Sequence, residues 1–231
     1  MLIERHLGSV AEDYESTLSR LRRVASGDEQ PILRFSRPGP IVGFGRRDEL
    51  NPGFDAARQA CEAHGFVPWV RKVGGRAAAY HSDCMIVDHL VRTQDPTSGT
   101  MARYRSFGRL WARILDGLGM PADVGELPGE YCAGEYSVHG IAPGGQKVKV
   151  VGTAQRVVSG AWWFSAGVVV SRPEPLRAVL DDVYRALHIP MDPRTVGSVS
   201  MAVPEVRWDD VEDAVLEAYE EWDKRCVDDM S

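Results

Sequence analysis

The strongest constraint on the fold lies in the second half of the chain, where two long strand-like runs are separated by only two residues. The runs read KVKVVGTAQRVV (147–158) and AWWFSAGVVVS (161–171), with Ser159 and Gly160 between them. Such a short connection can join only antiparallel neighbours, because a parallel pair needs a crossover of a dozen or more residues. These residues therefore predict an antiparallel hairpin within a sheet.

Shorter strand-like runs alternate with amphipathic helices elsewhere in the chain. Strands are predicted at 31–37, 40–45, 66–72 and 84–92. Apolar residues at helical spacing predict helices at 11–27, 54–65, 100–119, 173–188 and 208–225. The segment 120–145 is expected to be irregular. Most strands lie too close for crossover helices, so we expect an α+β fold: a central mixed, largely antiparallel sheet flanked by helices, in a single domain over residues 1–231.

Composition excludes several classes of function. The net charge of −6 argues against nucleic acid as a partner, because phosphate binding rests on clustered basic residues. No run approaches the ~18 apolar residues of a membrane span, and the acids near the N-terminus are atypical of a secretory signal, so we expect a cytoplasmic protein with no membrane partner. The cysteines lie far apart without a CxxC pair, which predicts free thiols and no metal site: Cys61, Cys84, Cys132 and Cys226.

The run VRKVGGRAAAYH is the first candidate site. Gly74 and Gly75 allow backbone N–H groups to approach a ligand closely. Three cations beside them can hold an anionic group: Arg71, Lys72 and Arg76. The alternative is a tight turn on a basic surface. The spacing matches neither a P-loop nor GxGxxG, so nucleotide binding does not follow from it.

Cys132 and the lysines of the run QKVKVVGTAQR form the second candidate site. Cys132 lies in the irregular run PGEYCAGEYSVHG, and a loop thiol near a lysine can act as a nucleophile, although most lone cysteines are apolar core residues. His139 is either its base or a turn residue. Lys147 and Lys149 project to the same face of a predicted strand. A lysine that points inward there can stabilise an oxyanion, or both are solvated lysines at a sheet edge.

Taken in order, these runs resemble the lipoate–protein ligase A and octanoyltransferase branch of the biotin/lipoate protein ligase superfamily. PILRFSRPGPIVGFGRRDEL is similar to that family's paired opening strands, VRKVGGRAAAYH to its glycine loop beside the acyl tunnel, and KVVGTAQR to its lysine motif. YCAGEYSV is similar to the cysteine motif of the amidotransferase members. The resemblance implies the biotin/lipoate ligase catalytic fold, with Cys132 as the nucleophile and Lys149 as the family lysine.

The resemblance also implies the residues that bind the acyl substrate. They are Arg71, Gly74, Gly75, Arg76, Ala77 and His81 in the glycine loop, and Gly152, Thr153, Ala154 and Gln155 after the lysine. The chain departs from the family pattern at Ala133, where a proline is usual. A histidine–glycine pair is replaced by VVSGAWWFSAG, whose tryptophans, Trp162 and Trp163, are expected to narrow or reshape the tunnel.

Three functions remain compatible with these residues. The leading hypothesis is transfer of an octanoyl or lipoyl group, through a Cys132 thioester and without a cofactor, to a lysine of a lipoyl carrier domain. The second is an ATP- and Mg-dependent lipoate–protein ligase that uses a separate accessory protein, since we expect no accessory C-terminal domain. The third is a non-catalytic acyl-binding protein. The implied partners are lipoyl carrier domains (the glycine cleavage H protein or the E2 component of 2-oxoacid dehydrogenases) or acyl carrier protein.

Overall fold

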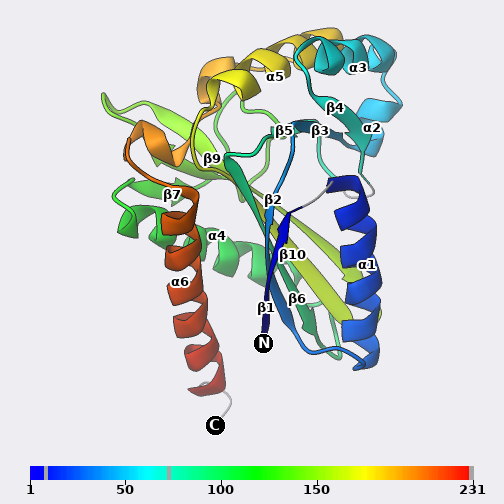
Figure 1. The fold of residues 1–231 in the computed structure, drawn as a ribbon, viewed down its shortest axis with the longest axis vertical. Helices are drawn as coiled ribbons and strands as arrows, with labels where there is room; N and C mark the ends of the chain where they lie inside the picture. The colour runs from blue at the N-terminus through cyan, green and yellow to red at the C-terminus, as the bar shows by residue number, and fades with distance from the viewer. Residues whose placement is uncertain (8–9, 72–73, 229–231) are drawn as a thin grey trace.

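Two β-sheets and the helices packed on them make up the fold (Figure 1). The computed structural model describes residues 1–7, 10–71 and 74–228. The strands are β1 (Leu2–Leu7), β2 (Ile32–Arg37), β3 (Ile41–Phe44), β4 (Val67–Val70), β5 (Ala78–Tyr80), β6 (Cys84–Arg92), β7 (Ala122–Val124), β8 (Val138–Ile141), β9 (Lys147–Val158) and β10 (Ala161–Val169). The helices are α1 (Val10–Ser26), α2 (Arg46–Glu49), α3 (Phe54–Ala63), α4 (Thr100–Gly117), α5 (Glu174–Ala186) and α6 (Trp208–Asp228), with short 3₁₀ helices at Pro193–Thr195 and Val199–Met201.

The larger sheet has seven strands in the order β1-β2-β6-β10-β9-β8-β7. Strands β9 and β10 form the predicted hairpin, with Ala161 opposite Val158 and Val168 opposite Val151. Among the described pairs of this sheet, β1 and β2 alone run parallel. The predicted fold class, a mixed and largely antiparallel sheet flanked by helices, is therefore confirmed.

The smaller sheet has three strands in the order β4-β3-β5, with β3 parallel to β4 and antiparallel to β5. The expectation that the two opening strands pair with each other is wrong, because β2 pairs with β1 and β6 in the larger sheet. Pro38 and Pro40 flank the connection between β2 and β3. A proline has no backbone N–H, so this connection cannot supply the hydrogen bonds of a tight hairpin, and the chain crosses between the sheets instead.

Four short strands were not predicted from the sequence pattern: β1, β5, β7 and β8. Strand β5 lies within the glycine-loop run and pairs with β3. The segment 120–145, expected to be irregular, contains β7 and β8, which pair with each other and through β8 with β9. Strand β1 exposes Leu2 and Ile3, so it lacks the buried alternation of a typical strand and is held by its ladder with β2. In each case the pairing partner lies elsewhere in the chain, where a local pattern cannot reveal it.

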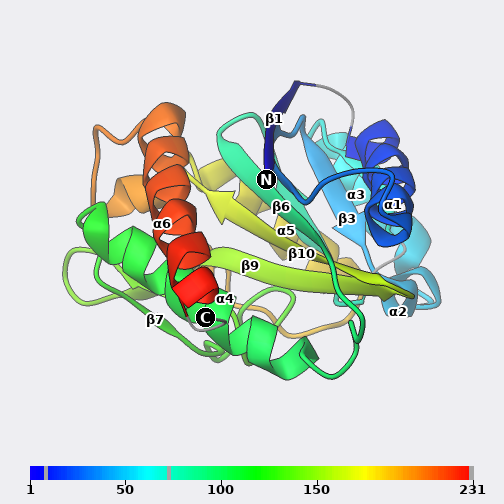
Figure 2. The same cartoon turned by 90° about the horizontal axis from the view of Figure 1, so that it is seen from below.

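Helices α4 and α6 cover one face of the larger sheet and α1 covers the other (Figure 2). The α4 face is filled by Phe107 and Trp111 against Phe164 and Trp162 of β10. Trp163, the next residue, faces α1 and packs beside Leu21, because successive side chains of a strand point to opposite faces.

The smaller sheet carries α3 and α5 on its outer side (Figure 1). The face of the larger sheet that carries α1 continues beneath the smaller sheet, and this region holds the candidate site described below. Within the described residues, no helix is both long enough and apolar enough to cross a membrane.

Candidate active site

A cavity of about 390 Å³ lies on the face of the larger sheet that α1 covers. Strands β6, β10 and β9 form its floor, and their register arranges the floor in three successive rows. The first row is Ile86, Gly167 and Gly152, the second is Asp88, Ser165 and Ala154, and the third is Leu90, Trp163 and Arg156. All of these except Leu90 line the cavity, so it extends along the strands for about two row spacings of ~6.6 Å each.

In the first row only Ile86 has a side chain that can project into the cavity, because the other two residues are glycines. A Cβ atom on Gly167 would lie 2.6 Å from the ring of Tyr80, which lines the opposite wall. The second row is polar: the Asp88 carboxylate accepts hydrogen bonds from Trp163 Nε1 at 2.8 Å and Ser165 Oγ at 2.6 Å. The cavity therefore runs from the glycine loop, beside the Gly152–Gly167 row, to Trp163 and Tyr14 at the other end.

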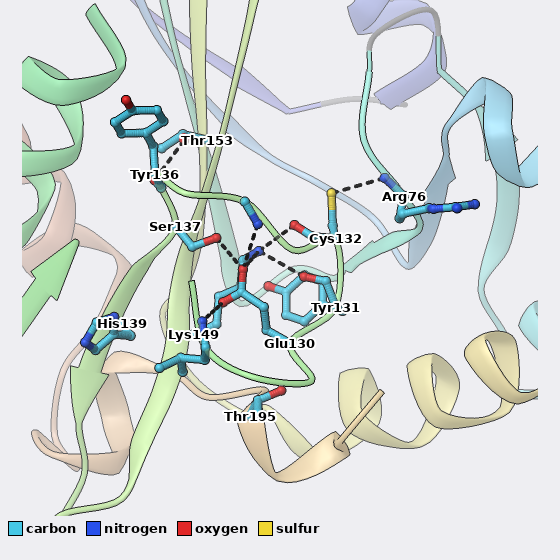
Figure 3. Close-up of polar contacts among 12 residues, drawn as sticks. Arg76, Glu130, Tyr131, Cys132, Tyr136, Ser137, His139, Lys149, Thr153 and Thr195 are labelled. Carbon is cyan, nitrogen blue, oxygen red and sulfur yellow. Dashed lines mark hydrogen bonds and ion pairs between the residues drawn. The ribbon is translucent and has the colours of Figure 1, made fainter. Parts of the chain in front are cut away.

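Cys132 lies at the glycine-loop end of the cavity, on the loop between β7 and β8 (Figure 3). Its Sγ accepts a hydrogen bond from the Arg76 backbone N–H at 3.3 Å and another from Arg71 Nη2 at 3.5 Å. Its φ of +43° lies in the left-handed region, which side-chain-bearing residues rarely adopt. A thiolate here would have its negative charge shared by two N–H donors.

Arg71 stays charged in this half-buried position. Burial opposes its charge, but the facing Cys132 and Tyr80 raise the pKa of the guanidinium above its usual value. Conversely, burial raises the pKa of Tyr80 to about 12, so its hydroxyl stays neutral. The cavity end thus combines a fixed cation with a neutral phenol and the Cys132 sulfur.

The glycine loop can approach Cys132 closely because two glycines leave room for it: Gly75 lies against the cysteine, and Gly45 lies against Gly75. A Cβ atom on Gly75, whose φ is +101°, would lie 2.8 Å from Cys132 Sγ. A Cβ atom on Gly45 would lie 1.9 Å from the Gly75 carbonyl oxygen. The loop is anchored from behind by Asp48, which is buried and accepts hydrogen bonds from Gly45 N–H and Arg76 Nη1.

Lys149 extends from β9 beneath the Cys132 loop and is only 1% exposed. Its Nζ lies 2.9 Å from the Tyr131 carbonyl oxygen, 2.9 Å from the Cys132 carbonyl oxygen and 3.1 Å from Glu130 Oε1 (Figure 3). The lysine therefore contacts the backbone of the cysteine, and no hydrogen bond joins its ammonium to the sulfur among the described residues.

Tyr184 of α5 joins the cysteine loop to the glycine loop. Its hydroxyl accepts a hydrogen bond from Cys132 N–H at 2.6 Å and donates one to the Ala77 carbonyl oxygen at 2.9 Å. Burial raises the pKa of this hydroxyl far above its usual value, so it remains a donor at any physiological pH.

We expect Tyr184→Phe to lower the free energy of unfolding by about 1–3 kcal/mol, because it leaves the Cys132 N–H and the Ala77 carbonyl without their partner. Chemical denaturation followed by tryptophan fluorescence measures the change. Tyr136→Phe is the matched control, since the Tyr136 hydroxyl has no hydrogen bond among the described residues; it should change stability by less than about 0.5 kcal/mol. Equal effects of the two variants would contradict the bridging role of Tyr184.

Most of the sequence-predicted substrate residues line the cavity. These are Arg71, Gly74, Gly75, Gly152, Thr153, Ala154 and Gln155, together with Cys132 and Lys149. Thr153 and Gln155 also anchor the wall, because Thr153 Oγ1 donates to the Tyr136 carbonyl at 3.0 Å and Gln155 Nε2 donates to the Thr100 carbonyl at 2.8 Å. Of the two tryptophans, Trp163 lines the cavity and Trp162 lies in the core on the opposite face.

Three predicted substrate residues lie outside the cavity lining. The His81 ring contacts the Arg172 carbonyl oxygen at 2.8 Å and accepts from Asp83 N–H at 3.0 Å, so it anchors a turn. Ala77 is fully buried. The Arg76 side chain turns away to Asp48, and only its backbone N–H faces Cys132. Lys72, the remaining cation of this loop, lies outside the described residues.

His139 does not stand beside Cys132. Its Nδ1 lies 3.3 Å from the Gly125 carbonyl oxygen, and Figure 3 shows the ring away from the sulfur. Cys61 and Cys84 are fully buried, and burial raises the pKa of each thiol to about 12. Of these three described thiols, Cys132 is thus the one that reaches the cavity.

Sequence reasoning missed Glu130, Tyr184 and Asp88. Glu130 directly precedes the YC pair in an irregular run, where a single acid usually indicates a solvated turn. Tyr184 fits the apolar stripe of its helix, and Asp88 interrupts an otherwise apolar strand. Only Asp88 could have been recognised from the sequence, because a carboxylate buried in a strand must have polar partners nearby.

This sheet arrangement, with a cavity beneath a glycine loop and a lysine from the central hairpin, defines a lipoate-ligase type of catalytic domain. The chain belongs to the lipoyl protein ligase A/B catalytic domain family, whose model matches residues 11–220. The family resemblance found in the sequence motifs is thereby confirmed.

A curated relative is the octanoyl-[GcvH]:protein N-octanoyltransferase of Geobacillus kaustophilus (strain HTA426). It is 27% identical over 137 residues, which are 59% of this chain and 47% of that protein. The match thus spans about half the length of the relative.

Two solved structures share the fold. Lipoate-protein ligase A bound with ATP superposes with a TM-score of 0.71 at 19% identity, covering 95% of this chain and 84% of that one. A bipartite lipoate protein ligase from Thermoplasma acidophilum, described with its E2 lipoyl domain, gives a TM-score of 0.62 at 20% identity, covering 95% and 82%. At these identities the likeness concerns the fold alone.

Proposed function

We propose that the protein is an acyltransferase that moves an octanoyl or lipoyl group onto a lysine of a lipoyl carrier domain through a thioester on Cys132. The observation that carries the proposal is the position of Cys132 Sγ at the end of the cavity, facing the Arg76 N–H and the Arg71 guanidinium. A thiolate stabilised in this way is the form that attacks acyl donors.

The proposed reaction has two displacement steps. The Cys132 thiolate attacks the carbonyl carbon of a donor thioester; the new C–S bond forms as the donor C–S bond breaks, and the donor leaves as a thiol after taking up a proton. The amine of the acceptor lysine then attacks the Cys132 thioester, forming an amide and losing a proton, and the Cys132 sulfur is released. The two steps divide the transfer into smaller barriers.

The acyl chain is proposed to lie along the cavity floor, from the Gly152–Gly167 row toward Trp163. Support comes from the absence of side chains at these glycines and from the length of the cavity along the strands. The carriers are proposed from the relatives: one is named for transfer from GcvH to protein, and the archaeal ligase is described with an E2 lipoyl domain.

The proposal is tested by intact mass spectrometry after incubation with an octanoyl-carrier thioester in the absence of ATP. We expect an octanoyl adduct that hydroxylamine removes, followed by octanoylation of an added lipoyl domain. Absence of the adduct, together with transfer that occurs only with free acid and ATP, would overturn it. A bound fatty acid with no adduct and no transfer under either condition would indicate a binding protein.

An ATP-dependent ligase is the second candidate, because one fold neighbour is described as bound with ATP. The phosphate of an acyl-adenylate would need a cation at the acyl end of the cavity. All three N–H groups of Lys149 are already engaged by the Cys132 loop, and Arg71 faces Cys132 and the Arg76 carbonyl. These two residues, as arranged, do not fit a nucleotide phosphate.

Ala154→Phe is expected to shorten the acyl chain that the cavity accepts, because Ala154 lies in the middle row of the floor. Acylation of Cys132 by an octanoyl thioester should fall about tenfold or more relative to acylation by a butanoyl thioester. The ratio of the two rates, measured by mass spectrometry, tests this. The control is Ala102→Phe on the exposed side of α4, which should leave the ratio unchanged. An unchanged ratio in Ala154→Phe would mean that the chain binds elsewhere.

A further inference from the structure

The Lys149 ammonium has no unused hydrogen-bond donor in this structure. An ammonium carries three N–H donors, and Lys149 Nζ has three acceptors within 3.1 Å: the carbonyl oxygens of Tyr131 and Cys132 and the Glu130 carboxylate. To polarise an acyl carbonyl, the ammonium would have to release one of these partners inside a buried site. The arrangement instead suits a group that holds the cysteine loop.

Glu130 is the second half of this arrangement. Its Oε1 accepts hydrogen bonds from Ser137 Oγ at 2.6 Å and Gly134 N–H at 3.1 Å in addition to Lys149, and its Oε2 accepts from Leu127 N–H at 3.1 Å. One carboxylate therefore ties together both ends of the 127–137 loop. The side chains of Glu130 and Lys149 are 0% and 1% exposed, so neither charge is compensated by water.

Cys132, which lies within the loop that Glu130 and Lys149 hold, has a strained backbone conformation. Cys132 has a φ of +43° and is followed by the Gly134 contact to Glu130. A non-glycine residue keeps this conformation only when its surroundings hold it. The Lys149 contacts to the carbonyl oxygens on either side of the Cys132 N–H supply such a constraint, and the conformation directs Sγ toward the Arg76 N–H.

We propose that Glu130 and Lys149 are a positioning pair: the buried ion pair holds the backbone of Cys132 so that its sulfur rests on the donors of the glycine loop. The assignment rests on the proposed function in that Cys132 is taken as the residue that is acylated. Lys149 then acts through the cysteine and not on the acyl carbonyl. Glu130 is as important as Lys149 for holding the Cys132 backbone.

Two reactions of the same sulfur separate these roles. Alkylation by iodoacetamide depends on an accessible thiolate, which the Arg76 N–H and Arg71 face in this position, and no acyl carbonyl takes part. Acylation by an octanoyl thioester requires the held sulfur and also any group that polarises the carbonyl. A positioning residue changes both rates by the same factor, whereas a carbonyl-polarising residue changes acylation alone.

The experiment measures both second-order rates at neutral pH for the full-length wild-type protein, Glu130→Gln and Lys149→Met. In Glu130→Gln, either orientation of the amide places an N–H group against a donor now bound by the carboxylate, so the loop loses its anchor. We expect both rates to fall roughly tenfold or more in each variant, with their ratio unchanged. The matched control is Glu126→Gln, an exposed glutamate of the same loop, which should keep both rates.

Acylation that falls in Lys149→Met while alkylation is kept would overturn the proposal, and so would wild-type rates in Glu130→Gln. Because Lys149→Met leaves the Glu130 carboxylate buried without its partner, that variant is at risk of misfolding. The double variant Glu130→Gln/Lys149→Met removes both charges together, and the same two rates are measured on it after circular dichroism shows that it is folded. If the wild-type protein forms no acyl adduct, the proposed function fails while the alkylation rates still decide whether the pair positions Cys132.

Discussion

Cys132→Ala is expected to lower octanoyl transfer to a lipoyl domain by roughly 10⁴-fold or more, because it removes the atom on which the covalent intermediate forms. The hydroxylamine-labile adduct should disappear from the mass spectrum at the same time. The substitution removes only the sulfur from a residue that is partly exposed to the cavity, so the fold should be retained. Single-turnover transfer from an octanoyl-carrier thioester, followed by mass spectrometry of the acceptor, measures the loss.

Cys61→Ala is the matched control for this prediction. Cys61 lies on the buried face of α3, where burial raises the pKa of its thiol to about 12, so it is not a nucleophile at neutral pH. Its replacement should leave transfer and the adduct intact. Full transfer by Cys132→Ala would show that no thioester on this residue is required, and the covalent route would have to be abandoned.

Gly75→Ala is expected to lower the rate of Cys132 acylation about 100-fold, because displacing a reactive atom by even 1 Å can have an effect of this size. The new Cβ atom would lie 2.8 Å from Cys132 Sγ and 2.9 Å from Arg71 Nη2, so both groups must move. The φ of +101° adds a conformational cost of about 1–2 kcal/mol for a residue with a side chain. Acylation rate and thermal stability are measured on the same preparation.

The control for this variant is Gly39→Ala in the connection between β2 and β3. A Cβ atom there has no neighbour within 4 Å, and Gly39 is not among the residues that line the cavity. It should acylate at the wild-type rate. Wild-type acylation by Gly75→Ala would mean that the glycine loop withdraws from the sulfur when substrate binds.

The elements predicted most accurately from the sequence are those whose signal is local and long. Helix α4 and the β9–β10 hairpin match their predicted positions closely, because apolar spacing of three to four residues and alternation over nine or more residues each specify one structure. The family was also accessible from sequence, since three motifs occur in the family's order. Strand β1 and the separation of β2 from β3 were not accessible, because each depends on a partner strand distant in sequence.

The residues of the candidate site could be predicted from the sequence, but the contacts among them could not. Cys132, Gly75 and Lys149 were singled out by residue type and motif, and they do converge at one end of the cavity. Their contacts could not be derived from the sequence: Lys149 contacts the Cys132 carbonyl oxygen, and a backbone N–H contacts the sulfur. Backbone donors leave no trace in a sequence, so this part of the site could not be read in advance.

The sequence by itself determined the secondary structure of the long elements, the fold class, the family and the residue types of the candidate site, because these follow from periodicity and from side-chain chemistry. Only the tertiary structure decided that Glu130 and Lys149 neutralise each other, that Tyr184 joins two loops, and that the φ of Cys132 is positive. The physical reason is that a buried charge or hydroxyl must find its partner wherever the fold provides one. Such partners are set by position in space and not by spacing along the chain.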